Sequence, residues 1–232
     1  MESTDLPRIR MLPLFAAMAE ANFGRLMRAA REEVVPAQTE LIREGEPADF
    51  LHVLIEGRVE LYARWNSRET VLEMVRPCRA FILAAVLKDG VYLKSGRTGQ
   101  RSRLLRVPAA DMREACRVDD AFVRAVLDEM AGCYREIVKQ QKDLKLRTAV
   151  ERLANSLLAF DGEQNGGGTI ELPCDKRTLA SLLGMTPENL SRAFATLKPY
   201  GVEVDGARIR LTDMASLERL AKPTPLIDDA AI

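Results

Sequence analysis

The stretch DKRTLASLLGMTPENLSRAF, residues Asp175 to Phe194, predicts two short helices joined by a tight turn. Gly184 can adopt the left-handed conformation that ends the first helix, and Thr186-Pro187 is a typical start for the second. Apolar residues recur at helical spacing in both halves and define two matching buried faces: Leu179, Leu182, Leu183, Leu190, Ala193 and Phe194. Pairs of short helices joined in this way form a DNA-binding motif whose second helix enters the major groove.

The second helix presents Glu188, Ser191 and Arg192 on its polar side. Arginine can bind guanine O6 and N7 together, glutamate can accept from cytosine N4, and serine can contact either kind of base. An ordinary helical hairpin with a solvated charged face is the alternative explanation. If the motif binds DNA, the further candidate contacts on its two helices are Lys176, Arg177, Thr178 and Asn189.

A β-hairpin follows the second helix. Its presence favours a DNA-binding motif over an ordinary pair of helices with a solvated face. Val202–Val204 and Ile209–Leu211 read as two strands, and Asp205-Gly206 between them suits a type I′ turn. A hairpin directly after a recognition helix makes a winged helix.

These segments resemble the DNA-binding domain of the CRP/FNR family of bacterial transcription regulators. Glu188-x-x-Ser191-Arg192 matches the pattern of the FNR branch, and Glu151-Arg152-Leu153-Ala154 is similar to the preceding helix of the family. The resemblance implies a TTGA-like half-site. It places Arg192 and Glu188 on the G·C pair of that half-site and Ser191 on a neighbouring thymine.

The first half of the chain has short β-type runs separated by turns, which predicts a sandwich or barrel. The runs are Phe50–Ile55, Val59–Tyr62, Val71–Val75 and Leu104–Val107. Leu41–Asp49 followed by Glu56–Val59 resembles the opening strands of the cyclic-nucleotide-binding-like β-barrel of the same family, a jelly roll or double-stranded β-helix. The resemblance thus covers nearly the whole chain.

A long helix is predicted from Asp120 to Lys145, because this stretch has no proline and only one glycine. An apolar seam close to a 3.5-residue repeat indicates pairing with a second helix: Phe122, Val126, Met130, Cys133, Ile137 and Leu144. A neighbouring face could pack on the barrel of the same chain: Val123, Leu127 and Tyr134. Both can hold at once, with one face packed inward and the other paired with a second copy. In the resembling family this helix is the dimer interface, so we expect a homodimer that reads an inverted repeat with half-sites ~34 Å apart.

The expected fold class is therefore α+β with three parts. Residues 1–115 form a sensor-like β-barrel domain with N-terminal helices, residues 116–146 a dimerisation helix, and residues 147–232 a winged helix-turn-helix domain. The expected function is a sequence-specific, homodimeric transcription regulator whose partners are double-stranded DNA and RNA polymerase. By family position, the turn Arg64–Glu69 is a candidate polymerase contact. Two alternatives stay open: a ligand-binding module with vestigial DNA binding, and a haem-based gas or redox sensor that controls DNA binding.

The overall charge gives no support to nucleic-acid binding, since 34 Lys and Arg balance 34 Asp and Glu. Positive charge must therefore be local, as at Lys176, Arg177, Arg192 and Lys198. No signal peptide is evident, and the apolar run Ala80–Leu87 is far shorter than a membrane span of ~20 residues. We expect a cytoplasmic protein without membrane contact.

Cyclic AMP binding is not expected. Nucleotide-binding members of the family carry a Gly-Glu segment and then an Arg-Ser or Arg-Thr pair, which hold the ribose and the cyclic phosphate. Phe81–Val86 stands in the first place without glycine or glutamate, and Arg97-Thr98 falls several residues late. The apolar segment either fills the core of the barrel or lines a pocket for a hydrophobic ligand.

Metal, cofactor and enzymatic sites are also not expected. No cysteine precedes Cys78, so an iron–sulfur cluster with N-terminal ligands is not expected. The single histidine, His52, is either a packed core residue or a haem ligand, and Cys174 is either a small residue at a strand end or a thiol switch. One histidine is too few for a metal-dependent barrel enzyme, and no nucleophile elbow or phosphate-cradling loop is present.

Overall fold

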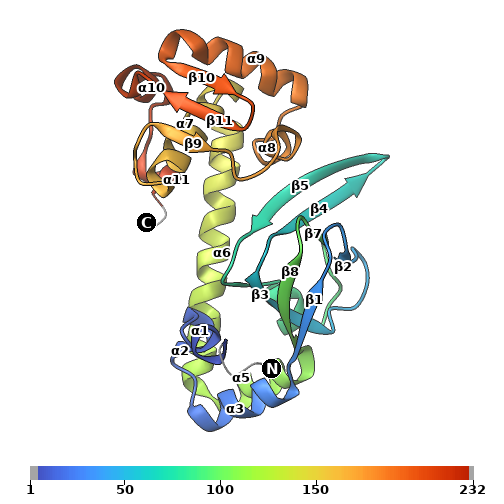
Figure 1. Cartoon of the computed structure of the whole chain (residues 1–232). Coiled ribbons are helices and arrows are strands. Elements are labelled where there is room, and N and C mark those ends of the chain that lie inside the picture. The colour runs from blue at the N-terminus through green and yellow to red at the C-terminus, as the bar shows by residue number, and fades with distance from the viewer. Residues whose placement is uncertain (1–4, 230–232) are drawn as a thin grey trace. The chain divides into compact units, whose positions relative to one another are not determined.

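The computed structural model describes residues 5–229. The chain divides into two compact units, Met1–Cys133 and Tyr134–Ile232, and each is described by itself (Figure 1). The division falls inside one continuous helix, α6 (Asp120–Leu146).

The strands of the first unit form two antiparallel four-stranded sheets, with the orders β1-β8-β3-β6 and β2-β7-β4-β5. Their bounds are β1 (Arg31–Val35), β2 (Glu40–Ile42), β3 (Phe50–Glu56), β4 (Val59–Trp65), β5 (Arg68–Val75), β6 (Arg79–Phe81), β7 (Ser95–Thr98) and β8 (Ser102–Pro108). The predicted strands are confirmed. Each sheet keeps two edge strands, so the expected barrel consists of two separate sheets and is not closed.

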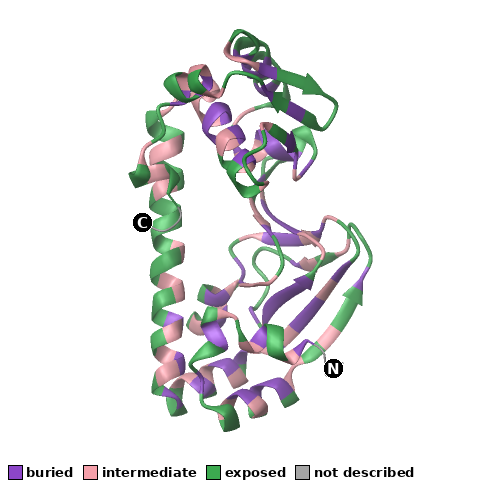
Figure 2. Cartoon of the chain, turned by 60° about the vertical axis from the view of Figure 1, so that its left-hand side comes forward, coloured by how far each residue is buried: buried purple, intermediate pink, exposed green. Residues whose placement is uncertain are grey.

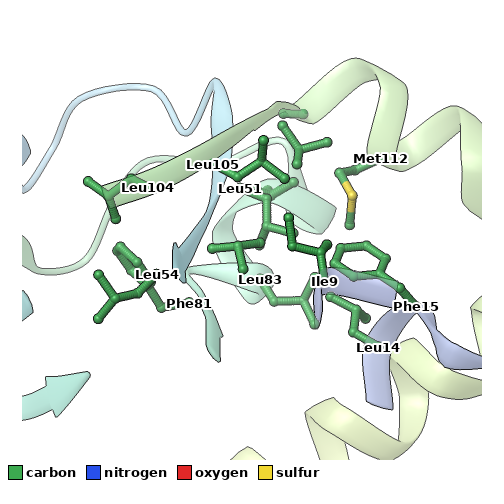
Figure 3. Packing of buried hydrophobic residues seen from close by; sticks show 14 of the residues in the cluster. Ile9, Leu14, Phe15, Leu51, Leu54, Phe81, Leu83, Leu104, Leu105 and Met112 are labelled. Atoms are coloured by element: carbon green, nitrogen blue, oxygen red, sulfur yellow. The ribbon is translucent and has the colours of Figure 1, made fainter. Parts of the chain in front are cut away.

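Helices cover one face of the β1-β8-β3-β6 sheet. They are α1 (Leu6–Arg10), α2 (Pro13–Ala16), α3 (Glu20–Ala29), α4 (Leu83–Lys88) and α5 (Ala109–Val118). Because successive strand residues point to opposite faces, Leu51 and Leu105 lie toward Met112 of α5, while Leu54 and Leu104 lie with Phe81 (Figure 3). Both sets belong to one buried apolar cluster.

The α6 helix begins at Asp120, four residues after the predicted boundary at 116. Cys116 and its neighbours belong to α5, and Asp119 between the two helices has an extended backbone (φ −140°). Asp119 Oδ1 accepts from the backbone N–H of Phe122 at 3.0 Å, and Asp119 Oδ2 accepts from that of Ala19 at 2.9 Å. This cap separates the two helices, and the predicted helix from Asp120 is confirmed.

The predicted division of α6 into a pairing face and an inward face is wrong in its first half. Phe122 and Val126, assigned to the pairing seam, are buried in the core of the first unit. The ring of Phe122 stacks on Phe15 at 6.1 Å. Leu127 and Tyr134, assigned to the inward face, are 62% and 69% exposed. Figure 2 shows how much of α6 is exposed. Apolar residues alternate between two faces one residue apart, so periodicity alone could not assign them.

The second unit contains a three-stranded sheet of order β10-β11-β9 and a set of short helices. Their bounds are α7 (Ala149–Glu163), β9 (Thr169–Glu171), α8 (Lys176–Leu182), α9 (Pro187–Leu197), the 3₁₀ turn η1 (Lys198–Tyr200), β10 (Val202–Asp205), β11 (Arg208–Leu211), α10 (Met214–Ala221) and α11 (Pro225–Asp228). The predicted helix pair and hairpin are confirmed as α8, α9 and β10–β11. The predicted type I′ turn at Asp205-Gly206 is wrong: Asp205 pairs with Arg208 and extends β10, so Gly206 and Ala207 form the loop, and of these two only Gly206 has positive φ. The β9 strand, which pairs with β11 through Ile170 and Ile209, was not predicted because three residues are too short for a clear period.

Candidate nucleic-acid interface

The first helix of the motif, α8, begins with a side-chain cap. Asp175 accepts hydrogen bonds from the backbone N–H of Thr178 at 2.9 Å and from its hydroxyl at 3.1 Å. Burial by itself raises the pKa of Asp175, but these bonds and other backbone N–H groups lower it below its usual value. Asp175 therefore stays ionised and stabilises the N-terminal end of α8.

The turn after α8 depends on Gly184 for two reasons. Its φ of +62° lies in the left-handed region, as predicted, and a Cβ at this position would lie 2.5 Å from Leu144 Cδ2 of α6. The turn therefore lies against the end of the half-exposed Leu144 side chain, in the C-terminal half of α6.

The second helix, α9, is held in place by its cap and its buried face. Thr186 Oγ1 accepts from the backbone N–H of Asn189 at 3.2 Å, and Pro187 occupies the first helical turn. The predicted apolar face of α9 is buried: Leu190, Ala193, Phe194 and Leu197. The remaining face projects Glu188, Asn189, Ser191 and Arg192, all exposed.

Hydrogen bonds organise the exposed face of α9. Arg192 Nη2 donates to Asn189 Oδ1 at 2.6 Å, one helical turn away. The pKa of Glu188 is lowered by a hydrogen bond from its own backbone N–H, by the Thr186 hydroxyl and by the charge of Arg192. The face thus combines an ionised acceptor with a guanidinium donor, as guanine and cytosine edges require. The Asn189–Arg192 bond was not predicted, although their i,i+3 spacing was a usable signal.

Basic residues around α9 differ in their surroundings. Lys176 and Arg177 are exposed at the start of α8, and Lys176 Nζ lies 5.7 Å from the centroid of Phe194. Lys198 is exposed just after α9. Thr178, in contrast, is only 7% exposed, and its hydroxyl is committed to the Asp175 cap.

The arginines of the β10–β11 wing have acidic neighbours. Arg210 pairs with Glu203 at 2.9 Å, and Arg208 lies 3.8 Å from Glu171. Since these side chains are mostly exposed, the pairs contribute little to stability but reduce the positive charge beside the recognition helix.

Arg97 and Thr98, the pair that resembles the Arg-Thr element of nucleotide-binding members, have other partners. Arg97 donates to Glu60 at 3.1 Å and to Glu69 at 2.6 Å. Thr98 is fully buried, and its hydroxyl donates to the Pro36 carbonyl at 2.6 Å. A cyclic phosphate needs cationic or N–H donors that face it, and this pair faces protein carboxylates and a carbonyl.

The apolar segment that stands in place of the Gly-Glu element fills the core. Phe81, Leu83 and Val86 are buried in the apolar cluster of the first unit. Ile82 between them has φ +70°, a left-handed conformation that β-branched residues rarely adopt. Of the two interpretations offered by the sequence, core filling agrees with this burial.

His52 lies on β3 directly between Phe81 of β6 and Arg106 of β8. It is 1% exposed, its ring stacks on that of Phe81 at 5.3 Å, and neither ring nitrogen has a hydrogen-bond partner among the described residues. Burial, and then the charge of Arg106, lower its pKa to about 4. His52 is therefore a neutral core residue at physiological pH. A haem iron could approach it only if the packing around Phe81 opened.

The four cysteines form no disulfide, and Cys174 is buried just before α8. Within residues 5–229, no group of three or more His, Cys, Asp or Glu side chains has an arrangement that could hold a metal ion. Over the same residues, no helix is both long enough and apolar enough to cross a bilayer.

Comparison with known proteins gives matches over both units. The family model of the cyclic nucleotide-binding domain matches residues 32–119, and that of the Crp-like helix-turn-helix domain matches residues 151–220. A CRP-like cAMP-activated global transcriptional regulator of Mycobacterium tuberculosis is 22% identical over 215 residues, which cover 90% of this chain and 96% of that protein.

Solved structures have a similar fold. FixK2 from Bradyrhizobium japonicum superimposes with a TM-score of 0.72 at 24% identity, covering 84% of this chain and 98% of that one. A CRP-family transcriptional regulator from Thermus thermophilus gives a TM-score of 0.65 at 20% identity, covering 83% and 97%. With a capped and exposed recognition helix, a nucleotide-binding-type domain and these relatives, the chain belongs to the CRP/FNR family of transcription regulators.

Proposed function

We propose that this regulator binds, as a homodimer, an inverted repeat of TTGA-like half-sites through Glu188, Ser191 and Arg192. The observation that carries the proposal is the exposed face of α9, where these three side chains lie together on a helix that is capped at Thr186 and packed from behind. Arg192 supplies paired donors for guanine, and Glu188 supplies an acceptor for cytosine. Lys176, Arg177, Asn189 and Lys198 add contacts, chiefly to phosphate.

Exposed apolar side chains on α6 support the homodimer. Leu127, Tyr134 and Ile137 are each more than 60% exposed, and Val138 is 38% exposed. Leu127, Tyr134 and Ile137 follow one another by seven and three residues, close to the spacing of a helix–helix seam, and Val138 lies next to Ile137. We place the pairing face of α6 on these residues and not on Phe122 and Val126.

The hairpin between β4 and β5 supports the predicted polymerase contact. Trp65 at its tip is 79% exposed, and Asn66 and Ser67 both have positive φ, as a tight two-residue turn requires. Tryptophan is enriched among the residues that anchor protein–protein interfaces. A regulator that contacts DNA and polymerase acts in the cytoplasm.

We propose that cyclic AMP is not the effector, because Arg97 and Thr98 are bound to protein groups and Phe81–Val86 is apolar. The same observations favour DNA binding that needs no nucleotide. The mycobacterial relative is named as cAMP-activated, so the two proteins differ in this respect under our proposal.

The test is DNA binding by the wild type and by Arg192→Ala, measured by fluorescence anisotropy at several salt concentrations. The duplexes carry a TTGA inverted repeat, the same repeat with the guanine of each half-site replaced, or a scrambled sequence. Arg192→Ala should lose ~1–3 kcal/mol per half-site on the intact repeat and bind the guanine-replaced duplex as the wild type does. Lys198→Ala, the control, should weaken binding to all three duplexes alike. Equal binding of wild type and Arg192→Ala to the intact repeat would contradict the assignment.

A further inference from the structure

The last described segment of the chain, residues 224–229, packs against the C-terminal half of α6. Arg147 donates through both terminal nitrogens to Asp228, at 2.7 Å to Oδ1 and 2.6 Å to Oδ2. Its side chain is only 7% exposed. This paired geometry is the strong form of an arginine–carboxylate contact, and it is partly shielded from water. The segment lies beyond residue 220, where the match to the helix-turn-helix family ends.

Further hydrogen bonds tie the same segment to α6. Lys142 Nζ donates to the Leu226 carbonyl at 3.1 Å, and Lys139 Nζ donates to the Asp229 carbonyl. Within the segment, the backbone N–H of Thr224 donates to Asp228 Oδ2 at 2.7 Å and so holds the carboxylate toward Arg147. Burial alone raises the pKa of Asp228, but the bonds from Arg147 and Thr224 lower it below its usual value.

Arg147 stands where α6 meets the DNA-binding domain. It follows the last residue of α6, Leu146, and precedes Thr148, the cap of α7. Arg147 also donates to Asp143 of α6 at 2.9 Å. Its guanidinium thus joins the end of α6 to α11 across the junction.

The same junction is connected to the turn of the helix-turn-helix. Arg152 of α7 donates to the Arg147 carbonyl at 2.7 Å and to the Leu183 carbonyl at 2.9 Å. Leu144 of α6 packs against Gly184, which follows Leu183. All of these contacts lie inside the second unit. A change of angle at residue 147 would therefore move α8 and α9 relative to the end of α6.

We propose that residues 224–229 form a clamp on the α6–α7 junction, and that Arg147 and Asp228 are positioning residues that set the separation of the two recognition helices in the dimer. The inference rests on the proposed function, since it concerns how a dimer reads two half-sites. Each α9 reads only a few base pairs, so affinity for the repeat depends on placing both helices one helical turn, ~34 Å, apart. A junction free to bend would place them over a range of separations, and ordering it on binding would cost affinity.

The first experiment tests the clamp without DNA. Hydrogen exchange is measured for peptides covering residues 144–152 in the full chain, in Asp228→Asn and in Glu218→Gln, where Glu218 is an exposed carboxylate of α10. Asp228→Asn removes a charge-assisted contact and should speed exchange about tenfold, whereas Glu218→Gln should not change it. A chain ending at Pro223 should show the same increase as Asp228→Asn. Unchanged exchange in both clamp variants would overturn the proposal.

The second experiment tests positioning. Binding is compared on a single half-site, on the repeat with one-turn spacing, and on repeats with one or two base pairs added or removed. Asp228→Asn should bind the single half-site as the wild type does, bind the one-turn repeat about fivefold more weakly, and lose its preference among spacings. Asp228→Glu keeps the charge and should recover part of that preference.

The two experiments separate the clamp from the proposed function. Faster exchange together with an unchanged spacing preference in Asp228→Asn would overturn the positioning role. If Asp228→Asn lost the same affinity for the half-site and for every repeat, the variant would have damaged α9 itself. That result would also overturn the positioning role. If the wild type does not distinguish TTGA from scrambled DNA, the proposed function fails, while the exchange result still decides whether the clamp exists.

Discussion

At the scale of single residues, burial decides the chemistry of His52. The imidazole has an ordinary pKa of 6.5 and a pKa of about 4 in the fold, because it is buried beside Arg106. The unfolded chain therefore binds a proton between these pH values and the folded chain does not. The stability that His52 contributes is fully present above pH 6.5 and is lost as the pH falls toward 4.

The predicted consequence is that the wild type loses about 2 kcal/mol more stability between pH 7.5 and pH 5 than His52→Phe does. Phenylalanine can keep the contact with the ring of Phe81 and has no group to protonate. Urea unfolding of both proteins at the two pH values measures the difference. If both proteins lost stability equally, the assignment of a buried neutral imidazole would be wrong.

At the scale of elements, the turn between α8 and α9 depends both on its own backbone conformation and on a contact with α6. Gly184 and Gly206 both have φ in the left-handed region, at +62° and +60°. A Cβ at 184 would lie 2.5 Å from Leu144, whereas a Cβ at 206 meets nothing within 4 Å. A substitution at Gly206 therefore tests backbone strain alone. A substitution at Gly184 tests backbone strain together with the contact with Leu144 of α6.

We expect Gly206→Ala to cost ~1 kcal/mol, as a left-handed alanine does. Gly184→Ala should cost ~0.5–1.5 kcal/mol more, because the half-exposed Leu144 side chain must leave its preferred rotamer. Thermal or urea unfolding of the two variants beside the wild type gives the comparison. Gly184→Ala should also weaken binding to the TTGA repeat, because Leu144 or the turn must move. Equal stability of the two variants would show that the contact with Leu144 does not hold the turn.

At the scale of the whole molecule, the equal numbers of acidic and basic residues make dimerisation important for DNA binding. With a formal net charge of 0, the chain has little general attraction to the DNA backbone, so two recognition helices acting together must supply affinity. We predict that Tyr134→Glu, on the proposed pairing face of α6, yields monomers, whereas Glu136→Gln, an exposed position on the opposite side of the same helix, leaves the dimer intact. Sedimentation velocity distinguishes the two states. A wild type that is monomeric both alone and with the TTGA repeat would remove the basis of this prediction.

Local sequence rules determined the elements of this protein and the face of α9 that meets solvent. Caps at Asp175 and Thr186 and the left-handed glycine at 184 act over a few residues, so their structures follow from neighbouring side chains. The hairpin after α9 was also predictable, although its turn lies at Gly206 and Ala207, one residue later than predicted. The same holds for Glu188, Ser191 and Arg192, because helical periodicity alone separates them from the buried face. The family follows from these residues and from the opening strands of the first unit.

Only the tertiary structure decided which apolar face of α6 is buried, how Arg97 and Thr98 are used, and where residues 224–229 lie. Faces one residue apart on α6 have similar composition, and Phe15 and the rest of the first core select Phe122. Arg97 and Glu69 are 28 residues apart in the chain, and Arg147 and Asp228 are 81 apart. Such pairs form only when the fold brings distant segments together, and no local pattern records them.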